Sequence, residues 1–275
     1  MPFKPILKKL YYSSRPGRLK WFPYFGSRVF FPPGSHLFFR VCEEDIYERE
    51  TLRLIGAYLR PGTTFFDVGA NIGLTSVPIL RDYPECEVVS FEPSPNALPS
   101  LQATHRETRY SGHWKVIPKA LGSKSGTADF FTGGPQSSAF DGLHDTGREG
   151  KRSVTAVQIS TLDEEWRQLA STTISVIKID VEGGELAVLD GGEKCIDTCR
   201  PAIILEWNTR NLSRHNCKPG ALLTWAQSHN YSLYTAHGGV NVFDSAQLEL
   251  VMLKTEDFIL LPNKVDTSVK SENAE

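Results

Sequence analysis

The pattern of apolar and polar positions predicts that strands and helices alternate along most of the chain. Helical spacing of apolar residues at 45–60 ends at a Pro-Gly pair, which is typical of a helix end. Short apolar runs that are typical of buried strands follow at residues 64–68, 88–92, 114–121, 175–180, 202–207, 231–236 and 258–262. This alternation predicts an α/β domain over residues 45–263 with a doubly wound, mostly parallel sheet.

The alternation is interrupted once, between residues 126 and 160. GTADFF (126–131) and SVTAVQIS (153–160) predict an antiparallel pair of strands. The segment between them is rich in Gly, Ser and Asp, and a loop of this length is usually a functional lid or disordered. Its Ser137 and Ser138 either donate hydrogen bonds to a substrate or only make the loop flexible.

Residues 1–44 are expected to form a basic, aromatic arm. Its segment 28–41 contains two aromatic runs around Pro-Pro-Gly and predicts a small hairpin. Such an arm suits nucleic acid or an anionic membrane surface, but it suits equally the acidic body of its own domain or of a homodimer partner. Because the net charge of the whole chain is -2, we expect no nucleic-acid partner. Residues 264–275 predict a disordered tail.

The cysteine pattern indicates a reducing, cytoplasmic environment. The five cysteines are odd in number and form no C-x-x-C pair, and the basic start has no apolar segment typical of a signal peptide. Cys195 and Cys199 are four residues apart, but without a His or Cys partner at metal spacing we expect them to be buried thiols. No apolar stretch approaches the roughly 20 residues of a membrane span.

Acidic residues close four of the predicted strands, at Asp67, Glu92, Asp180 and Glu206. In a doubly wound sheet, ligands bind at the carboxyl ends of the strands. An acid at the end of the second strand, here Glu92, accepts hydrogen bonds from a ribose diol, which indicates an adenosine ligand. In the alternative interpretation Glu92 is a surface acid.

The glycine turn in FFDVGANIG (65–73) helps to choose between two adenosine ligands. The dinucleotide fingerprint G-x-G-x-x-G, counted from Gly69, needs glycine where this chain has Asn71 and Leu74. S-adenosylmethionine (SAM) has no pyrophosphate, and its methionine end needs only a tight turn with exposed amides. The turn therefore favours SAM over NAD, although glycines that merely shape a strand-to-helix turn remain the alternative.

Several motifs together resemble the FkbM family of SAM-dependent methyltransferases. They are DVGANIG, FEPSPNALPSL, KALG followed by GTADFF, VQISTLDE, VIKIDVEGGELAVLDGG and PAIILEW, and they extend over residues 61–207. The resemblance implies a class I methyltransferase (Rossmann-like) fold with a seven-stranded sheet. It also implies methyl transfer to hydroxyl groups of natural products, sugars and related small molecules.

The resemblance further implies which residues hold the cofactor. Asp67, Gly69 and Asn71 would line the methionine end of SAM. Glu92 would hold the ribose, and residues 119–121 would lie beside the adenine. The implied set is Asp67, Gly69, Ala70, Asn71, Gly73, Glu92, Pro93, Ala120, Leu121 and Asp180. The helix after FEPSPNALPSL ends in His105 and Arg106 instead of the Asn-containing ending of many relatives, which leaves the adenine-side wall less defined.

A hydroxyl acceptor must lose a proton during methyl transfer, and a positioned base typically contributes about 10²–10⁴-fold. Asp180 or Glu182 is the predicted base. Strand alternation puts Lys178 on the same side as Asp180, where it either holds the carboxylate or only braces the sheet. His144 in the lid and His237 beyond a strand are other candidate bases, although loop histidines are more often surface residues.

A divalent metal is the alternative to a base. Asp180, Glu182 and Glu206 end or follow neighbouring strands, and three carboxylates together are able to bind Mg²⁺ or Ca²⁺ and orient a deprotonated hydroxyl. No EF-hand-like spacing supports this interpretation.

The sequence therefore predicts a SAM-dependent methyltransferase that acts on a small-molecule hydroxyl, and a phosphorylated or lipid-linked sugar would also account for the basic arm. An NAD-dependent oxidoreductase and a catalytically silent, methyltransferase-like binding subunit are the alternatives. A silent protein would bind adenosine ligands without turnover, so methyl transfer itself separates the interpretations.

Overall fold

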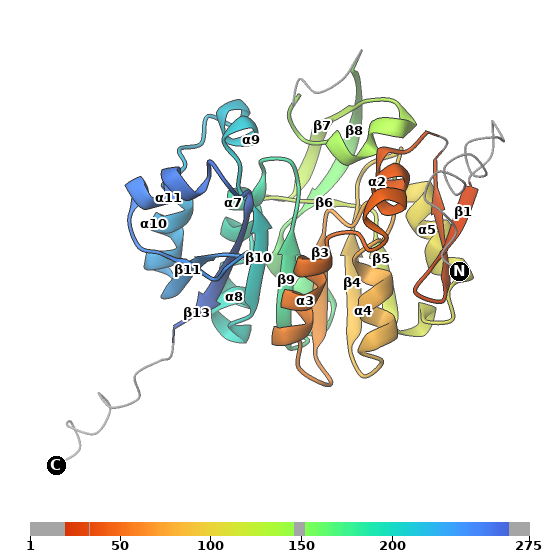
Figure 1. Cartoon of the computed structure of the whole chain (residues 1–275), viewed down its shortest axis with the longest axis horizontal. Helices are drawn as coiled ribbons and strands as arrows, with labels where there is room; N and C mark the ends of the chain where they lie inside the picture. The colour runs from red at the N-terminus through yellow and green to blue at the C-terminus, as the bar shows by residue number, and fades with distance from the viewer. Residues whose placement is uncertain (1–19, 33, 146–151, 264–275) are drawn as a thin grey trace.

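The computed structural model describes residues 20–32, 34–145 and 152–263, so residues 1–19 of the basic arm and the tail expected to be disordered lie outside it. An eight-stranded sheet forms the centre of the molecule (Figure 1). Its strand order is β12 (Asn241–Val242), β11 (Tyr231–Thr235), β13 (Asp257–Pro262), β10 (Ala202–Glu206), β9 (Ile174–Ile179), β3 (Thr64–Val68), β4 (Glu87–Phe91) and β5 (Trp114–Ile117).

The sheet is mostly parallel, as the alternation predicts. The five strands from β10 to β5 are parallel to their neighbours, whereas β13 runs antiparallel between β10 and β11. Seven of these strands are those expected, and the two-residue β12 is an eighth that pairs with β11. Strands buried on both faces read as continuous apolar runs, which is why the sequence identifies them well.

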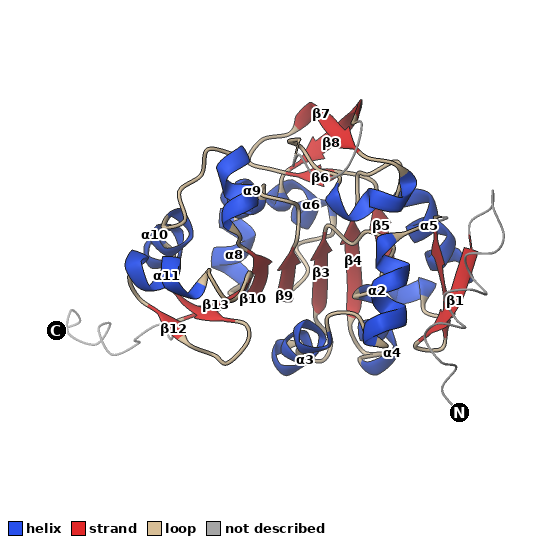
Figure 2. Cartoon of the chain, turned by 45° about the horizontal axis from the view of Figure 1, so that its top comes forward, coloured by secondary structure: helices blue, strands red, loops and turns tan. Residues whose placement is uncertain are grey.

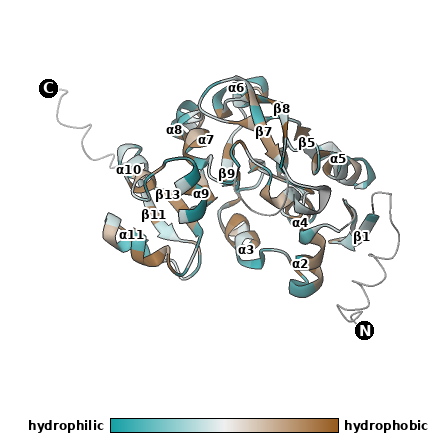
Figure 3. Cartoon of the chain, turned by 90° about the horizontal axis from the view of Figure 1, so that it is seen from above, coloured by the Kyte–Doolittle hydropathy of each residue, from teal (hydrophilic) through white to brown (hydrophobic). Residues whose placement is uncertain are grey.

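Helices cover both faces of the sheet and produce two cores. Successive residues of β3 face opposite sides, so Phe65 packs in one core and Phe66 in the other. The Phe65 side is covered by α2 (His36–Glu44), α3 (Arg49–Tyr58), α4 (Ser76–Asp82) and α5 (Leu98–Glu107). The Phe66 side is covered by α6 (Leu162–Gln168), α7 (Glu185–Asp190), α8 (Glu193–Cys199), α9 (Thr209–Arg214), α10 (Ala221–Ser228) and α11 (Ser245–Val251). Figure 3 shows these helices around the central strands.

A second, three-stranded sheet lies beyond the carboxyl ends of the parallel strands (Figure 2). Its strands are β6 (Ala120–Leu121), β8 (Ser153–Ser160) and β7 (Gly126–Thr132), with β7 and β8 antiparallel as expected. The predicted strand over residues 114–121 is therefore two strands, because the chain leaves the main sheet after β5 and joins the small sheet at β6. Two 3₁₀ turns complete the fold, at η1 (Ser111–His113) and η2 (Pro135–Phe140).

The hairpin predicted around the Pro-Pro-Gly sequence is wrong. The hairpin is formed by β1 (Lys20–Tyr24) and β2 (Ser27–Phe31), whose turn places Phe25 and Gly26 at positive φ. The second aromatic run is helix α2, which buries Leu37, Phe38, Val41 and Cys42. This spacing follows one helical face, and the stacking of Phe38 on Phe31, with ring centroids 4.2 Å apart, fixes α2 against the hairpin.

The hairpin packs on its own domain. The backbone amide of Phe30 donates to the Thr104 hydroxyl at 2.9 Å, and Ser27 and Thr108 share a hydrogen bond of 2.9 Å. The next segment, α2, lies against η2, where the rings of His36 and Phe140 are 6.0 Å apart. Residues 20–44 therefore contact both α5 and the segment over the carboxyl ends. Within the described residues, no helix combines the length and apolar character of a membrane span.

Candidate functional site

A cavity opens at the carboxyl ends of the parallel strands, where doubly wound sheets bind their ligands. Its walls contain most of the cofactor residues expected from the sequence, namely Gly69, Ala70, Asn71, Glu92, Pro93, Ala120, Leu121 and Asp180. Lys178 and Glu182 also line it. Asp67 and Gly73 do not: Asp67 is fully buried, and Gly73 packs against Trp114 and Leu101.

The turn after β3 requires glycine at Gly69. Its φ is +83°, and a Cβ atom added there would lie 1.9 Å from the carbonyl oxygen of Asp180. The amides of Gly69 and Ala70 both donate to the Phe91 carbonyl, at 3.0 and 3.1 Å. The turn therefore rests directly on the backbone that carries Asp180.

Asp67 has one carboxylate oxygen without a partner. The Ser76 hydroxyl donates to Oδ2 at 2.6 Å. The hydroxyls of Ser76 and Ser90 share a second hydrogen bond, and the Trp114 indole donates to Ser90. The other oxygen, Oδ1, is buried with no hydrogen-bond partner among the described residues. Burial raises the pKa of Asp67, partly offset by Lys178. An unpartnered carboxylate oxygen two residues before the turn fits an ammonium group reached through water.

Glu92 is held by backbone amides at the end of β4. Its two carboxylate oxygens accept from the amides of Asn71 and Ser94, each at 2.7 Å, and the side chain is 5% exposed. Burial raises the pKa of Glu92 to about 7 despite these bonds. Each carboxylate oxygen retains a lone pair, so the group is able to accept further bonds from a ligand diol.

The start of the predicted lid closes over this turn. The Asn71 side chain donates to the Ser138 carbonyl at 3.0 Å, and the Ser138 hydroxyl donates back to Asn71 Oδ1 at 3.3 Å. Asp141, which also lines the cavity, accepts from the Ser94 hydroxyl at 2.6 Å and from Asn96 Nδ2 at 3.0 Å. Sequence reasoning missed Asp141, since an acid in a polar loop gives no distinctive signal. Residues 146–151 of the lid lie outside the described residues.

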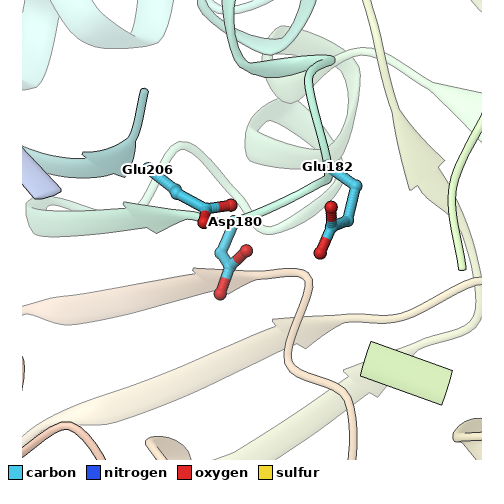
Figure 4. Close-up of side chains that lie close together, drawn as sticks. All are labelled: Asp180, Glu182 and Glu206. Atoms are coloured by element: carbon cyan, nitrogen blue, oxygen red, sulfur yellow. The ribbon is translucent and has the colours of Figure 1, made fainter. Parts of the chain in front are cut away.

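Three acids converge beside the cavity, two of which, Asp180 and Glu182, also line it (Figure 4). One oxygen each of Asp180, Glu182 and Glu206 lies within 4.8 Å of the other two. They come from the end of β9, the loop after it and the end of β10. Burial, followed by the nearby carboxylates, raises the pKa of Glu206 to about 10, so this group is protonated at neutral pH.

Two residues that sequence reasoning missed hold these acids in place. Glu185 accepts from the amides of Val181 and Gly183, at 3.3 and 2.9 Å, which fixes the turn in which Glu182 has a φ of +58°. Asn211 on α9 donates to Glu182 at 3.0 Å and lies 3.5 Å from Glu206. Glu185 could have been noticed as the last acid of KIDVEGGE, whereas Asn211 has no signal in the sequence.

Lys178 is buried and paired, as strand alternation predicts. Its Nζ lies 3.0 Å from Asp180 Oδ2 and 3.9 Å from Glu48 Oε2. Burial alone lowers the pKa of Lys178, but Asp180 and then Glu48 raise it above its ordinary value, so the amine stays charged. Glu48 and the neighbouring Tyr47, which lines the cavity, were also missed because they precede every recognised motif.

The two candidate histidines lie outside the cavity wall. His237 Nδ1 is 3.8 Å from Asp257 Oδ2, and the His237 side chain is half exposed. His144 makes an edge-to-face contact with His215, whose Nε2 is 3.2 Å from the Glu182 carbonyl. Both histidines are therefore less suited than Asp180 to act as a base. None of the five cysteines forms a disulfide among the described residues.

Comparison with known families decides the assignment. The model described as "Methyltransferase FkbM domain" matches residues 67–233, more than half of the chain. The chain belongs to the FkbM methyltransferase family. The match begins at Asp67, near the end of β3, and contains β4, β9 and β10, so it includes the strand ends that carry the acids described above.

Two curated methyltransferases are similar to this chain over part of their length. A hexuronic acid methyltransferase, AglP, of Haloferax volcanii is 29% identical, with 57% of this chain and 61% of AglP covered. The 31-O-demethyl-FK506 methyltransferase FkbM of Streptomyces tacrolimicus is 31% identical, with 50% of this chain and 62% of that protein covered. The chain thus spans about three fifths of these relatives.

The crystal structure of an FkbM methyltransferase from Methylobacillus flagellatus is similar to 82% of this chain. The match covers 53% of that protein, with 15% sequence identity and a TM-score of 0.49.

Proposed function

We propose that this protein is a SAM-dependent methyltransferase that transfers the methyl group to a hydroxyl of a small molecule. One observation is the main support for the proposal. The glycine turn that begins with Gly69 packs against the Asp180 carbonyl, and both residues line the same cavity. A cofactor on that turn and an acceptor beside Asp180 would be neighbours, which suits a direct transfer between them. Membership of a methyltransferase family further disfavours the oxidoreductase alternative.

The chain offers groups that match each part of the cofactor. Asp67 has an unpartnered buried oxygen for the ammonium side, and Glu92 has free lone pairs for the ribose diol. Ala120 and Leu121 provide an apolar wall suited to the adenine. When bound, SAM supplies a methyl group activated on sulfonium sulfur.

In this proposal Asp180 takes the proton of the acceptor hydroxyl. Its carboxylate lines the cavity and is hydrogen-bonded to the Lys178 ammonium at 3.0 Å, which fixes its direction. Glu182 is the second candidate base, but its carboxylate accepts a hydrogen bond from Asn211 on α9. Glu206 is a poor base at neutral pH because its raised pKa keeps it protonated.

A divalent metal at Asp180, Glu182 and Glu206 is the mechanistic alternative. Their mutual distance of 4.8 Å or less suits oxygen ligands of one ion. Burial is the main cause of the raised pKa of Glu206, and a bound cation would offset the repulsion between carboxylates that adds to it. Chelation followed by readdition of Mg²⁺ tests it: lost and restored turnover supports the metal, while unchanged turnover supports the base.

We propose a neutral hydroxyl compound as the acceptor in the absence of a metal. The acids beside the transfer position disfavour an anionic group there. A uronic acid, the substrate class in the name of AglP, or a phosphorylated, lipid-linked sugar would need a cation in that cluster. A homodimer remains a proposal based on the basic arm.

The first experiment is calorimetric titration with S-adenosylhomocysteine and, separately, with NAD, followed by methyl transfer to a panel of polyhydroxyl acceptors. We expect binding of S-adenosylhomocysteine alone. Asp180→Asn should reduce turnover by about 10²–10⁴-fold with little change in S-adenosylhomocysteine affinity. Asp82→Asn makes the same chemical change at an exposed residue on α4 and is the matched control.

Binding of NAD alone would contradict the proposal. Binding of S-adenosylhomocysteine without transfer to any acceptor would instead favour a silent binding protein. An Asp180→Asn variant as active as the wild type would move the base to Glu182 or to a metal-bound hydroxyl.

A further inference from the structure

Asp180 borders two cavities, and packing alone does not fix its carboxylate. One is the large cavity described above, and the second is a polar cavity of about 310 Å³ lined by Glu48, Lys178, Glu206 and Asp257 as well. A side chain with open space on two sides keeps rotational freedom unless polar contacts restrict it. The hydrogen bond from Lys178 is the contact that restricts Asp180.

Lys178 itself needs a second anchor. Its side chain is 7% exposed and carries a charge, and Asp180 occupies only one of its three ammonium donors. Glu48 provides a carboxylate 3.9 Å from the same nitrogen, from a segment outside the region matched by the family model. The amine therefore has two carboxylates within 4 Å, those of Asp180 and Glu48.

The backbone at Glu48 is held in an unfavourable conformation that brings the side chain to Lys178. Its φ of +46° and ψ of +51° are left-handed values, which are unfavourable for a non-glycine residue. The residue stands at the N-cap of α3, yet its side chain does not cap the helix. The amide of the preceding Tyr47 donates to the Tyr24 hydroxyl at 3.2 Å, which ties this corner to the N-terminal hairpin.

We propose that Glu48 is a positioning residue for methyl transfer, which holds Lys178 so that its ammonium orients the Asp180 carboxylate toward the acceptor. The N-terminal hairpin has a function in this arrangement, because Tyr24 fixes the corner that presents Glu48. The inference rests on the proposed function, since it assigns a role in that reaction to a residue before the family domain.

Two substitutions separate this role from a purely structural one. Glu48→Gly removes the carboxylate and relieves the left-handed strain, so thermal stability should be unchanged or higher while kcat falls about tenfold or more. Glu48→Gln retains the shape without the charge and should lose kcat similarly, with KM for SAM within about twofold of the wild type. Glu50→Gln, on the exposed side of α3 where it pairs with Arg53, is the control and should leave both constants unchanged.

A Glu48→Gly variant with wild-type kcat would overturn the inference. So would parallel losses of kcat and stability in both Glu48 variants, because these indicate a structural brace. A fall in kcat of Glu48→Gln with unchanged KM supports positioning.

If the wild type binds S-adenosylhomocysteine but transfers no methyl group, the proposed function fails. The contact between Glu48 and Lys178 is then tested separately by a double-mutant cycle of Glu48→Gln and Lys178→Met, in which the unfolding midpoint of each variant is measured. Non-additive shifts support the Glu48–Lys178 interaction, and additive shifts overturn it.

Discussion

The acids on the two sides of the cavity differ in the groups that they contact. On the cofactor side, Glu92 accepts two short bonds from backbone amides. On the other side, Asp180, Glu182 and Glu206 face one another, and the described donors between them are the Lys178 ammonium and the Asn211 amide. The cofactor side is thus already organised for hydrogen bonding, while the acid cluster is organised to receive a proton or a cation.

Backbone geometry is the strongest determinant of the cofactor side. Gly69→Ala should lower the free energy of unfolding by about 2–5 kcal/mol, because a left-handed φ is strained and the new Cβ would meet the Asp180 carbonyl. The same substitution should abolish binding of S-adenosylhomocysteine. Urea unfolding and calorimetry measure both effects.

Gly62→Ala is the matched control for this prediction. Gly62 has a φ of +72° but no heavy atom within 4 Å of the added Cβ, so only the strain of about 1–3 kcal/mol remains. Equal destabilisation by the two substitutions would show that the contact with Asp180 contributes nothing.

Glu92 makes the cofactor side sensitive to pH. A ribose diol donates more strongly to an ionised carboxylate, so affinity for S-adenosylhomocysteine should rise as pH increases through about 7, the raised pKa of Glu92. Glu92→Gln should weaken binding by about 1–3 kcal/mol at pH 8 and remove this pH dependence. Titrations at pH 6 and pH 8 measure it, and a pH dependence that persists in the variant would assign it to another group.

The effect of Glu92 on stability has the opposite direction. Because its pKa in the folded state, about 7, exceeds the ordinary value of 4.5, folding is favoured by the protonated form. This contribution is complete below about pH 4.5 and is lost as pH rises through about 7. Glu92→Gln should therefore flatten that part of the stability profile measured by urea unfolding.

The smallest effect is expected from Glu206→Gln in the acid cluster. Since the pKa of Glu206 is raised to about 10, the residue is already neutral at pH 7, and glutamine is a neutral group of the same shape. The free energy of unfolding without divalent ions should change by less than about 1 kcal/mol. If Mg²⁺ stabilises the wild type but not this variant, the cluster is a metal site and the two sides of the cavity differ in ligand as well as in charge.

The sequence predicts the parts of this molecule that depend on local patterns. Buried parallel strands are continuous apolar runs, and the Gly69 turn and the KIDVEGGE segment are contiguous motifs, so the main sheet and the strand-end acids follow from the sequence. Glu48, Asp141 and Asn211 do not, because each reaches the site from a distant segment with no pattern of its own. The hairpin error has a different origin, because aromatic runs beside Pro-Pro-Gly have a local pattern that suits either a strand or, as in α2, an amphipathic helix.

The contact between Gly69 and the Asp180 carbonyl also has a consequence for altering the acceptor range by directed evolution. Changes near this contact would disturb the proposed cofactor turn and the proposed base together, so we expect few to be tolerated. His144 and His215 meet beside Glu182 and are outside that contact. A library that varies these two histidines and the exposed positions of α9 would therefore change the surroundings of Glu182 while the contact between Gly69 and Asp180 stays intact.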